Sequence, residues 1–134
     1  MSHENVERVR EAVEAINRGD FDAPLDRAHP DLEWQTLDTF PDAGTYRGRE
    51  GVRTFFQTWL DTFTGFRLHL EKCVPVDEYR VLAMLRVSGE GAESGVAVES
   101  PPFFQLLEYR EGLLIRARMF QTERQALEAA GLPN

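Results

Sequence analysis

The first part of the chain carries apolar residues at spacings of three and four. Between residues 2 and 18 these apolar positions are separated by charged ones, which predicts an amphipathic helix with Ser2 as its N-cap and Gly19 at its end. The stretch "DFDAPLDRAHPD" predicts a second, short helix that Asp20 caps and Pro30 ends. Each helix is expected to turn one apolar face toward a core.

The clearest helical pattern lies between residues 52 and 63. Before it, the alternation from Leu32 to Leu37 predicts a strand, and "DTFPDAGTYRG", residues 38–48, predicts a loop. The helix carries an i, i+3, i+4, i+7, i+8, i+11 pattern with four aromatic rings on one stripe. Its members are Val52, Phe55, Phe56, Trp59, Leu60 and Phe63.

After Gly65 the period of the apolar residues changes to two, which predicts four long strands and two hairpin turns. The turns are "SGEGAESG" and "YREG", and on the last strand Leu113, Ile115, Ala117 and Met119 alternate with an opposite set. A Thr-x-x-Gln pattern at residues 122–125 predicts a capping box for a last helix ending near residue 130. Helices and strands segregated in this way predict an α+β fold with helices on one face of an antiparallel sheet.

Composition limits the classes of protein that this chain can represent. Its 134 residues predict a single domain, residues 1–134, and 23 acidic against 15 basic residues give a formal net charge of −8, which disfavours nucleic-acid and membrane partners. One cysteine, Cys73, cannot form an intramolecular disulfide. The N-terminus has no apolar signal segment and no apolar run reaches the length of a membrane span, so we expect a cytoplasmic protein.

Four segments, in order, resemble the SnoaL-like branch of the nuclear transport factor 2-like superfamily. They are "AINRGDFDAPLDRAHPDLEW", "YRGREGVRTFFQTW", "SGVAVE" and "RQALEAAGL". The resemblance implies a cone, a cystatin-like α+β roll in which a curved antiparallel sheet wraps around the helices and encloses an apolar pocket. It also implies dimerisation through the outer sheet face. Relatives include ketosteroid isomerases, polyketide cyclases, an epoxide hydrolase and dehydratases, so the fold alone does not define the function.

The catalytic residues of these relatives are not kept here. The resemblance places the isomerase tyrosine, base and oxyanion acid near Ala12, Thr36 and Gln105, and none of the three residue types is retained. No carboxylate occurs between residues 113 and 122, where other relatives use one. On the first strand, Glu33 is expected to point outward, which leaves Asp38 as the candidate acid or base.

Metal and nucleophile chemistry is not indicated. His3, His29 and His69 have no ligand spacing, so we expect surface or hydrogen-bonded strand residues and neither a metal nor a cofactor. Cys73 is interpreted as a small buried hydrophobic residue.

Gln105 interrupts the apolar run "FFQLL". A buried amide without partners is costly, so it either anchors a ligand or bonds to Gln121, Thr36 or a trapped water. If the resemblance places the strands correctly, the predicted pocket wall contains Gln105, Trp34, Phe55, Phe56, Trp59, Phe103, Leu107, Ala117, Met119 and Gln121.

Two functions of different class follow. The chain is a pocket protein for a small apolar ligand, either a binder or an enzyme of unassigned reaction, and the missing carboxylates favour the binder. The alternative is a cofactor-independent isomerase, cyclase or dehydratase acting on a polyketide-like or steroid-like substrate. We also expect a homodimer that forms through outward-facing residues of the last strands: Leu106, Leu114, Arg116, Arg118 and Phe120. The alternative is that these residues pack under the terminal helix. Glu108 or the second subunit is expected to pair with the two arginines.

Overall fold

Helices and strands follow one another in the order of an α+β protein, as the sequence predicts. The computed structural model describes residues 2–37 and 44–133. Within them, no helix is both long enough and apolar enough to cross a membrane. The helices are α1 (Ser2–Asn17), α2 (Asp22–Asp26), α3 (Gly48–Thr62) and α4 (Glu123–Ala129). The strands are β1 (Ala28–Gln35), β2 (Thr45–Arg47), β3 (Phe63–Pro75), β4 (Arg80–Gly91), β5 (Ala97–Glu99), β6 (Phe103–Arg110) and β7 (Leu113–Phe120).

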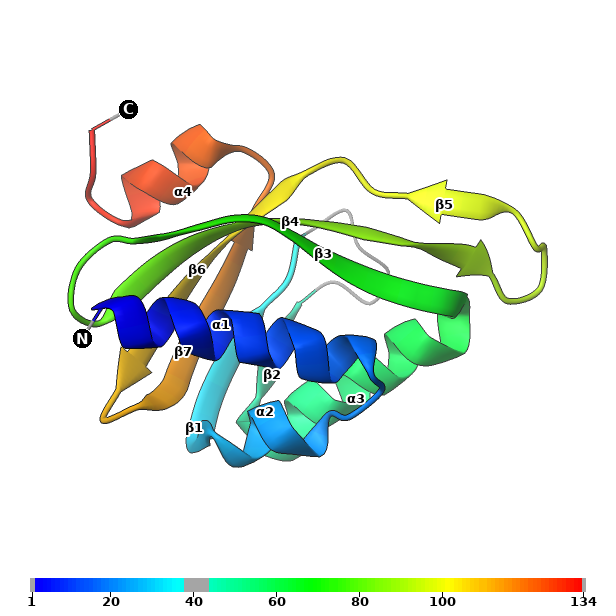
Figure 1. Ribbon diagram of the computed structural model, residues 1–134, viewed down its shortest axis with the longest axis horizontal. Coiled ribbons are helices and arrows are strands. Elements are labelled where there is room, and N and C mark those ends of the chain that lie inside the picture. Colours follow the sequence, from blue (N-terminus) through cyan, green and yellow to red (C-terminus); the bar gives the residue numbers. More distant parts are fainter. Residues whose placement is uncertain (1, 38–43, 134) are drawn as a thin grey trace.

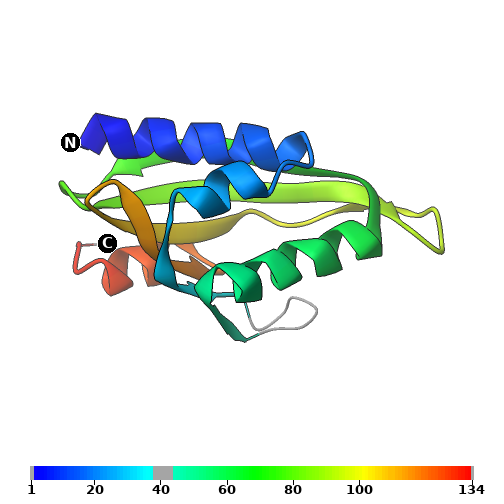
Figure 2. The same ribbon diagram turned by 90° about the horizontal axis from the view of Figure 1, so that it is seen from below.

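The strands form one curved sheet in the order β2-β1-β7-β6-β4-β3, with β5 paired to β4. Neighbouring strands are antiparallel except β1 and β7, which run parallel. The sheet curves around α1, α2 and α3, while α4 packs against β6 and β7 on the other face (Figure 1; Figure 2). This curvature gives the expected cone, whose interior lies between the three helices and the sheet.

Alternate residues of the central strands point into the cone and form the core. On β6 the inward positions from Phe103 to Tyr109 are all buried. The strand register places Ala83 of β4 on one side of Gln105 and Met119 of β7 on the other. The amide of Gln105 therefore lies within an otherwise apolar wall.

A smaller apolar cluster lies on the outer face beneath α4. Leu82 and Leu106 are paired across β4 and β6, and both are buried although they point away from the main core. Ala126 and Ala130 are the buried residues at the α4 end of this contact. The terminal helix therefore covers part of the outer face, which is the alternative that the sequence left open for Leu106.

The last helix begins with the predicted capping box. The hydroxyl of Thr122 accepts a hydrogen bond from the Gln125 backbone N–H at 3.1 Å, and the Gln125 side chain accepts one from the Thr122 N–H at 3.3 Å. Two N–H groups that the first helical turn leaves without partners are satisfied in this way.

The helix that carries the aromatic stripe ends one residue earlier than the prediction requires. Phe63 is extended, with φ −124° and ψ 139°, and is the first residue of β3. Its ring still packs against Trp59, with ring centroids 6.1 Å apart. The helical period predicted the contact correctly, but the chain reaches it from a strand.

The structure also differs from the prediction around β1. The short helix ends at Asp26 and β1 begins at Ala28, so Pro30 lies within the strand and does not end the helix. The register with β7 shifts between Ala28 and Glu33, and such an irregularity accommodates a proline that cannot donate a ladder hydrogen bond.

A short strand lies in the segment predicted as a loop. Residues 45–47 form β2, which pairs with β1 through Glu33, Trp34 and Gln35. Because residues 38–48 are mostly polar and contain turn-forming residues, their pattern did not predict this three-residue strand.

Candidate ligand-binding cavity

Two small internal cavities lie between the helices and the inner sheet face. The larger has a volume of about 60 Å³ and is lined by apolar side chains of α1, α2, α3 and the central strands. The smaller, of about 30 Å³, lies toward the far end of α3, beside Trp59 and Phe66. Five residues border both cavities, which makes them one divided apolar interior: Trp34, Phe56, Leu68, Leu85 and Gln105.

Aromatic rings of α3 and β1 form one wall of this interior. Trp34 meets Phe56 edge to face with centroids 5.3 Å apart, and Phe55 lies 5.4 Å from Trp59. Trp59 in turn contacts Phe66 at 5.5 Å with nearly perpendicular rings. Offset and edge-to-face contacts of this kind stabilise a rigid wall beyond the effect of burial alone.

Two hydrogen-bond donors in this wall, on Gln105 and Trp34, have no partner among the residues that the structure describes. Gln105 is 5% exposed and Trp34 is 8% exposed. No described residue accepts a hydrogen bond from Gln105 Nε2 or from Trp34 Nε1. A buried donor without a partner costs about 1–3 kcal/mol. Two such donors therefore lie unsatisfied in the wall of one apolar interior.

Neither side chain proposed as a partner of Gln105 bonds to it. The Thr36 hydroxyl accepts from the Gly44 N–H at 2.9 Å and donates to the Gly44 carbonyl oxygen at 3.2 Å. Gln121 is exposed, and its backbone N–H donates to Gln125 Oε1 at 3.1 Å. Neither residue forms a hydrogen bond with Gln105, so a side-chain bond that fixes strand packing is not seen.

Most of the predicted wall residues come together. The smaller cavity is bordered by seven of them, and Leu107 borders the larger one. Ala117 is fully buried in the sheet between Trp34 and Leu107. The seven are Trp34, Phe55, Phe56, Trp59, Phe103, Gln105 and Met119.

Three predicted site residues do not border either cavity as described. Ala117 is buried within the sheet, and the other two are Gln121 and Asp38. Gln121 is exposed because β7 ends at Phe120, so the inward alternation through Met119 does not continue to residue 121. Asp38, the candidate acid or base, lies outside the described residues. The structure therefore corrects the placement of Gln121 and leaves Asp38 as a prediction.

Leu114 was predicted to face outward, and the structure places it inside. The register between β6 and β7 shifts between Glu108 and Tyr109, so Tyr109 pairs with Leu114. This bulge reverses the phase at the start of β7, and Leu114 borders the larger cavity. A two-residue period read along one strand cannot anticipate the extra residue.

Sequence reasoning did not assign Tyr109 to the interior wall. It follows Leu107 by two residues on β6, so continuing the same alternation would have found it. Burial raises the pKa of the Tyr109 hydroxyl well above its usual value, and the hydroxyl therefore stays protonated. It is the only titratable residue among the described residues that border the two cavities.

Other reactive side chains are inert or dispersed. Burial raises the pKa of the Cys73 thiol to about 11, so it is protonated and poorly nucleophilic at neutral pH. His69 Nε2 lies 2.6 Å from the Ser88 hydroxyl. The described residues contain no cluster of histidine, cysteine, aspartate or glutamate suited to a metal ion. The interior can thus donate hydrogen bonds, and its described wall offers no carboxylate or imidazole.

The outer sheet face carries ion pairs in a different arrangement from the one expected. Glu33 points outward, as predicted, and lies 3.0 Å from Arg47 and 3.9 Å from Arg116. Glu108, the expected partner of the outer arginines, instead lies 3.6 Å from Arg110. Glu108 is the cross-strand neighbour of Arg116 and favours the charged form of Arg118, but the ion pair of Arg116 is formed with Glu33 of β1. Pairing of these arginines with a second subunit stays a prediction.

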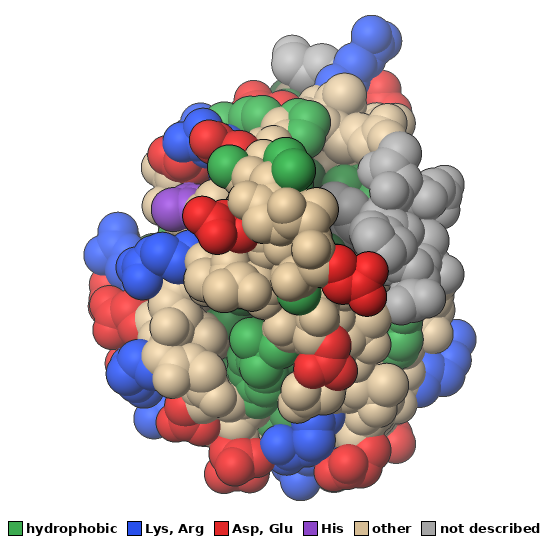
Figure 3. Space-filling model, turned by 90° about the vertical axis from the view of Figure 1, so that its right-hand side faces the viewer, with side chains coloured by type: hydrophobic (Ala, Val, Ile, Leu, Met, Phe, Trp, Pro, Cys, Tyr) green, Lys and Arg blue, Asp and Glu red, His purple; other side chains and the backbone are tan. Residues whose placement is uncertain are grey.

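The far end of the molecule, where β4 and β5 project, has a mixed surface. Figure 3 shows acidic and apolar side chains intermixed on this end. Val96 and Val98 are exposed there. Apolar side chains scattered among charges are ordinary for a protein surface.

Comparison with known proteins agrees with this architecture. The family description "SnoaL-like domain" matches residues 9–117. Bal32a from a soil-derived mobile gene cassette superposes with a TM-score of 0.79 at 23% identity, over 96% of both chains. A SnoaL-like polyketide cyclase from Jannaschia gives 0.74 at 19% identity, over 99% of this chain and 95% of that one. TerC, co-crystallised with polyporic acid, gives 0.75 at 19% identity, over 96% and 98%. The chain matches no curated protein sequence.

Proposed function

We propose that this chain, which belongs to the SnoaL-like family, binds a small, mostly apolar molecule that carries a hydrogen-bond acceptor such as a carbonyl oxygen. The observation that carries the proposal is the pair of unpartnered donors, Gln105 Nε2 and Trp34 Nε1, in the wall of one apolar interior. An acceptor on the ligand would satisfy donors that the protein itself leaves unpaired.

The amide suits this role at any physiological pH. Where the resemblance places a carboxylic acid that must stay protonated to donate, Gln105 donates without any change in pKa. Its neighbours across the sheet, Ala83 and Met119, cannot compete for the donor. Binding therefore depends on the shape of the ligand and the position of its acceptor.

The size of the interior favours slender ligands. Its compartments of about 60 and 30 Å³ are smaller than the cavity of about 150 Å³ that binds benzene in an engineered protein core. A narrow chain can enter a divided space of this kind more easily than a fused-ring molecule. A polycyclic ligand would have to displace wall side chains.

The alternative function is a cofactor-independent isomerase, cyclase or dehydratase acting on a polyketide-like or steroid-like substrate. The likeness to a polyketide cyclase from Jannaschia supports it. Such chemistry needs a group that transfers protons beside the ligand, and Asp38 is the candidate. Replacement of Asp38 by Asn should abolish turnover of a carbonyl substrate if this alternative is correct, while a binder would keep its affinity.

Titration calorimetry with 2-decanone tests the proposed function. Gln105→Leu should weaken binding by about 1–2 kcal/mol, equivalent to a roughly 5- to 30-fold rise in Kd. The matched control is Gln35→Leu, because Gln35 is an exposed glutamine on β1. Equal binding by Gln105→Leu and the parent protein would remove the functional role of the amide.

A homodimer through the outer sheet face remains part of the proposal. Leu106 is covered and Leu114 faces inward, so the outward set is reduced to Arg116, Arg118 and Phe120. Burial, together with neighbouring Arg116, lowers the pKa of Arg118, which indicates a crowded cation that an acidic partner residue would stabilise. Arg118→Glu should alter the mass measured by light scattering, whereas Arg10→Glu should not.

A further inference from the structure

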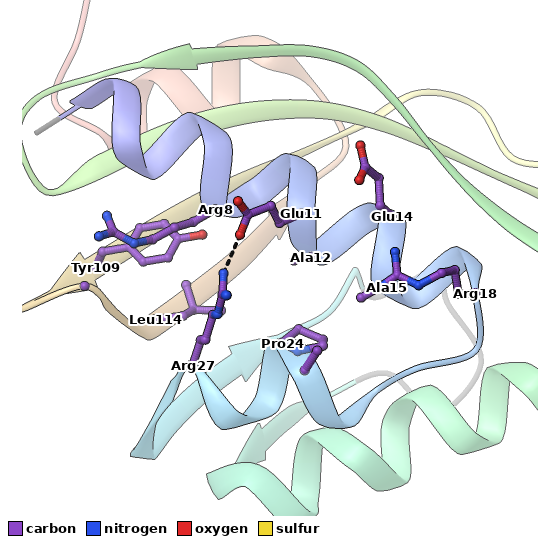
Figure 4. A pocket seen from close by; sticks show the side chains of 12 residues that line it. Arg8, Glu11, Ala12, Glu14, Ala15, Arg18, Pro24, Arg27, Tyr109 and Leu114 are labelled. Atoms are coloured by element: carbon purple, nitrogen blue, oxygen red, sulfur yellow. Dashed lines mark hydrogen bonds and ion pairs between the residues drawn. The ribbon is translucent and has the colours of Figure 1, made fainter.

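A larger cleft lies outside the interior, between α1, α2 and the turn that joins β6 to β7. Its volume is about 260 Å³ (Figure 4). Four of its lining residues also border the larger internal cavity: Ala12, Pro24, Tyr109 and Leu114. The cleft and the interior therefore adjoin each other at these four side chains, one of which is an alanine.

Arginine side chains from two helices surround this cleft. Arg27, at the end of α2, forms an ion pair with Glu11 of α1 across it (Figure 4). Arg8 lies over the ring of Tyr109 at 6.0 Å. Arg18 has no carboxylate partner within the described part of the chain, and Glu14 points away from α2 in Figure 4. Three arginines and two glutamates line the cleft, so its lining is positive on balance in a chain with a net charge of −8.

The inward face of β6 connects the cleft with the unpartnered amide. Gln105, Leu107 and Tyr109 alternate along this face; Tyr109 borders the cleft, and Gln105 borders both internal cavities. Four residues of extended strand span roughly 13 Å. An elongated molecule lying along this face could therefore reach Gln105 at one end while its other end stays in the cleft.

We propose that the α1–α2 cleft is the mouth of the binding site and that the ligand is an elongated oxo-carboxylic acid. Its carboxylate lies in the cleft with Arg27 and Arg18, its chain passes Ala12 and Leu114, and its oxo group accepts from Gln105. This inference rests on the proposed function, because it assigns the chemistry of the second end of the same ligand.

The bridging ion pair fits this role. The Arg27 and Glu11 side chains are 64% and 56% exposed, and exposed pairs contribute little to stability. A ligand carboxylate can thus replace Glu11 as the partner of Arg27 without a large loss of protein stability. The anion also gains the planar, two-pronged donor geometry of a guanidinium group.

Three matched probes separate the two ends of the ligand. The probe 9-oxodecanoic acid carries both groups, 2-decanone lacks the carboxylate and decanoic acid lacks the ketone. Measured by titration calorimetry at low salt, the oxo acid should bind about tenfold more tightly than either single-function probe.

The variants assign each end to a residue. Arg27→Met should weaken both acids about tenfold and leave 2-decanone unchanged, whereas Gln105→Leu should weaken the two ketones and leave decanoic acid unchanged. Glu11→Gln should strengthen both acids several-fold, because it removes the competing carboxylate. The control is Arg10→Met, since Arg10 is an exposed α1 arginine paired with Glu7 and does not border the cleft.

The outcomes distinguish the two proposals. If 2-decanone binds in a Gln105-dependent way but the oxo acid gains nothing from its carboxylate, the mouth assignment is wrong and the proposed function stands. If Arg10→Met weakens the acids as much as Arg27→Met does, the effect is general charge and the assignment is also wrong. If none of the three probes binds, both proposals are wrong.

Discussion

Two carboxamide side chains in this protein have opposite environments. Asn17, at the end of α1, donates to the Leu68 carbonyl oxygen at 2.9 Å and accepts from the Leu68 N–H at 2.8 Å. Gln105, in the middle of β6, is more deeply buried, and its Nε2 has no partner in the described part of the chain. The first amide joins a helix end to the outermost strand of the sheet, whereas the second faces a cavity. The same functional group is structural in one place and available to a ligand in the other.

The largest expected effect is on the satisfied amide. Asn17→Leu removes two hydrogen bonds and leaves the N–H and carbonyl groups of Leu68 without their partner. The free energy of unfolding should fall by about 2–3 kcal/mol in urea denaturation. A loss below about 0.5 kcal/mol would show that water replaces the amide at this edge of the sheet.

The unsatisfied amide should respond in the opposite direction. Without ligand, Gln105→Leu should raise the free energy of unfolding by about 1 kcal/mol, because an unpaired donor is replaced by an apolar side chain among Ala83 and Met119. The measurement is the same urea denaturation. Destabilisation would mean that the amide has a partner in solution, and the contrast with Asn17 would disappear.

A third polar group, the half-buried thiol of Cys73 on β3, tests how well packing against the core excludes water at the edge of the sheet. The pKa of Cys73 is raised by burial from 9.0 to about 11, so between these values the unfolded chain releases a proton that the folded protein keeps. The thiol therefore contributes its full share to the free energy of unfolding below pH 9, and this share is lost as the pH rises to about 11. Its size is about 1 kcal/mol after allowance for the partial exposure of the thiol.

Comparison of the parent with Cys73→Ala isolates this contribution. The difference between their free energies of unfolding should change with pH only above about 9, where the thiol of the unfolded chain ionises. An unchanged difference between pH 8 and pH 11 would show that the thiol is as well solvated in the folded state as in the unfolded chain.

The smallest expected effect concerns the backbone beside the cleft. Glu111 has φ +52° in the two-residue turn that it forms with Gly112, and asparagine and glycine adopt this conformation more easily. Glu111→Asn should therefore raise the melting temperature slightly, with a gain of about 0.5 kcal/mol. Glu93→Asn serves as a surface control, and an equal gain there would exclude relief of strain as the cause.

Much of the fold could be predicted because its signals are local. The stripe from Val52 to Trp59, the alternation along β6 and the Thr122 capping box each depend on residues within about one helical turn or one strand. Two of the errors occurred where a bulge or the end of a strand interrupts the period. Leu114 and Gln121 were misplaced for this reason.

The sequence by itself determined which faces are buried and that one glutamine lies in an apolar wall. Periodicity records the direction of a side chain relative to its own element, and this is a local property of helix and strand geometry. Periodicity therefore predicted the α+β architecture, and together with the family resemblance it predicted Trp34, Phe56 and Gln105 as wall residues.

Only the tertiary structure decided which buried polar groups are satisfied. The partners of Asn17 lie 51 residues away on β3, and the cover over Leu106 comes from a helix that follows it by many residues. The parallel pairing of β1 with β7 likewise joins distant parts of the chain and brings Glu33 close to Arg116. Whether a donor has a partner depends on distances between atoms far apart in sequence, and no local pattern contains that information.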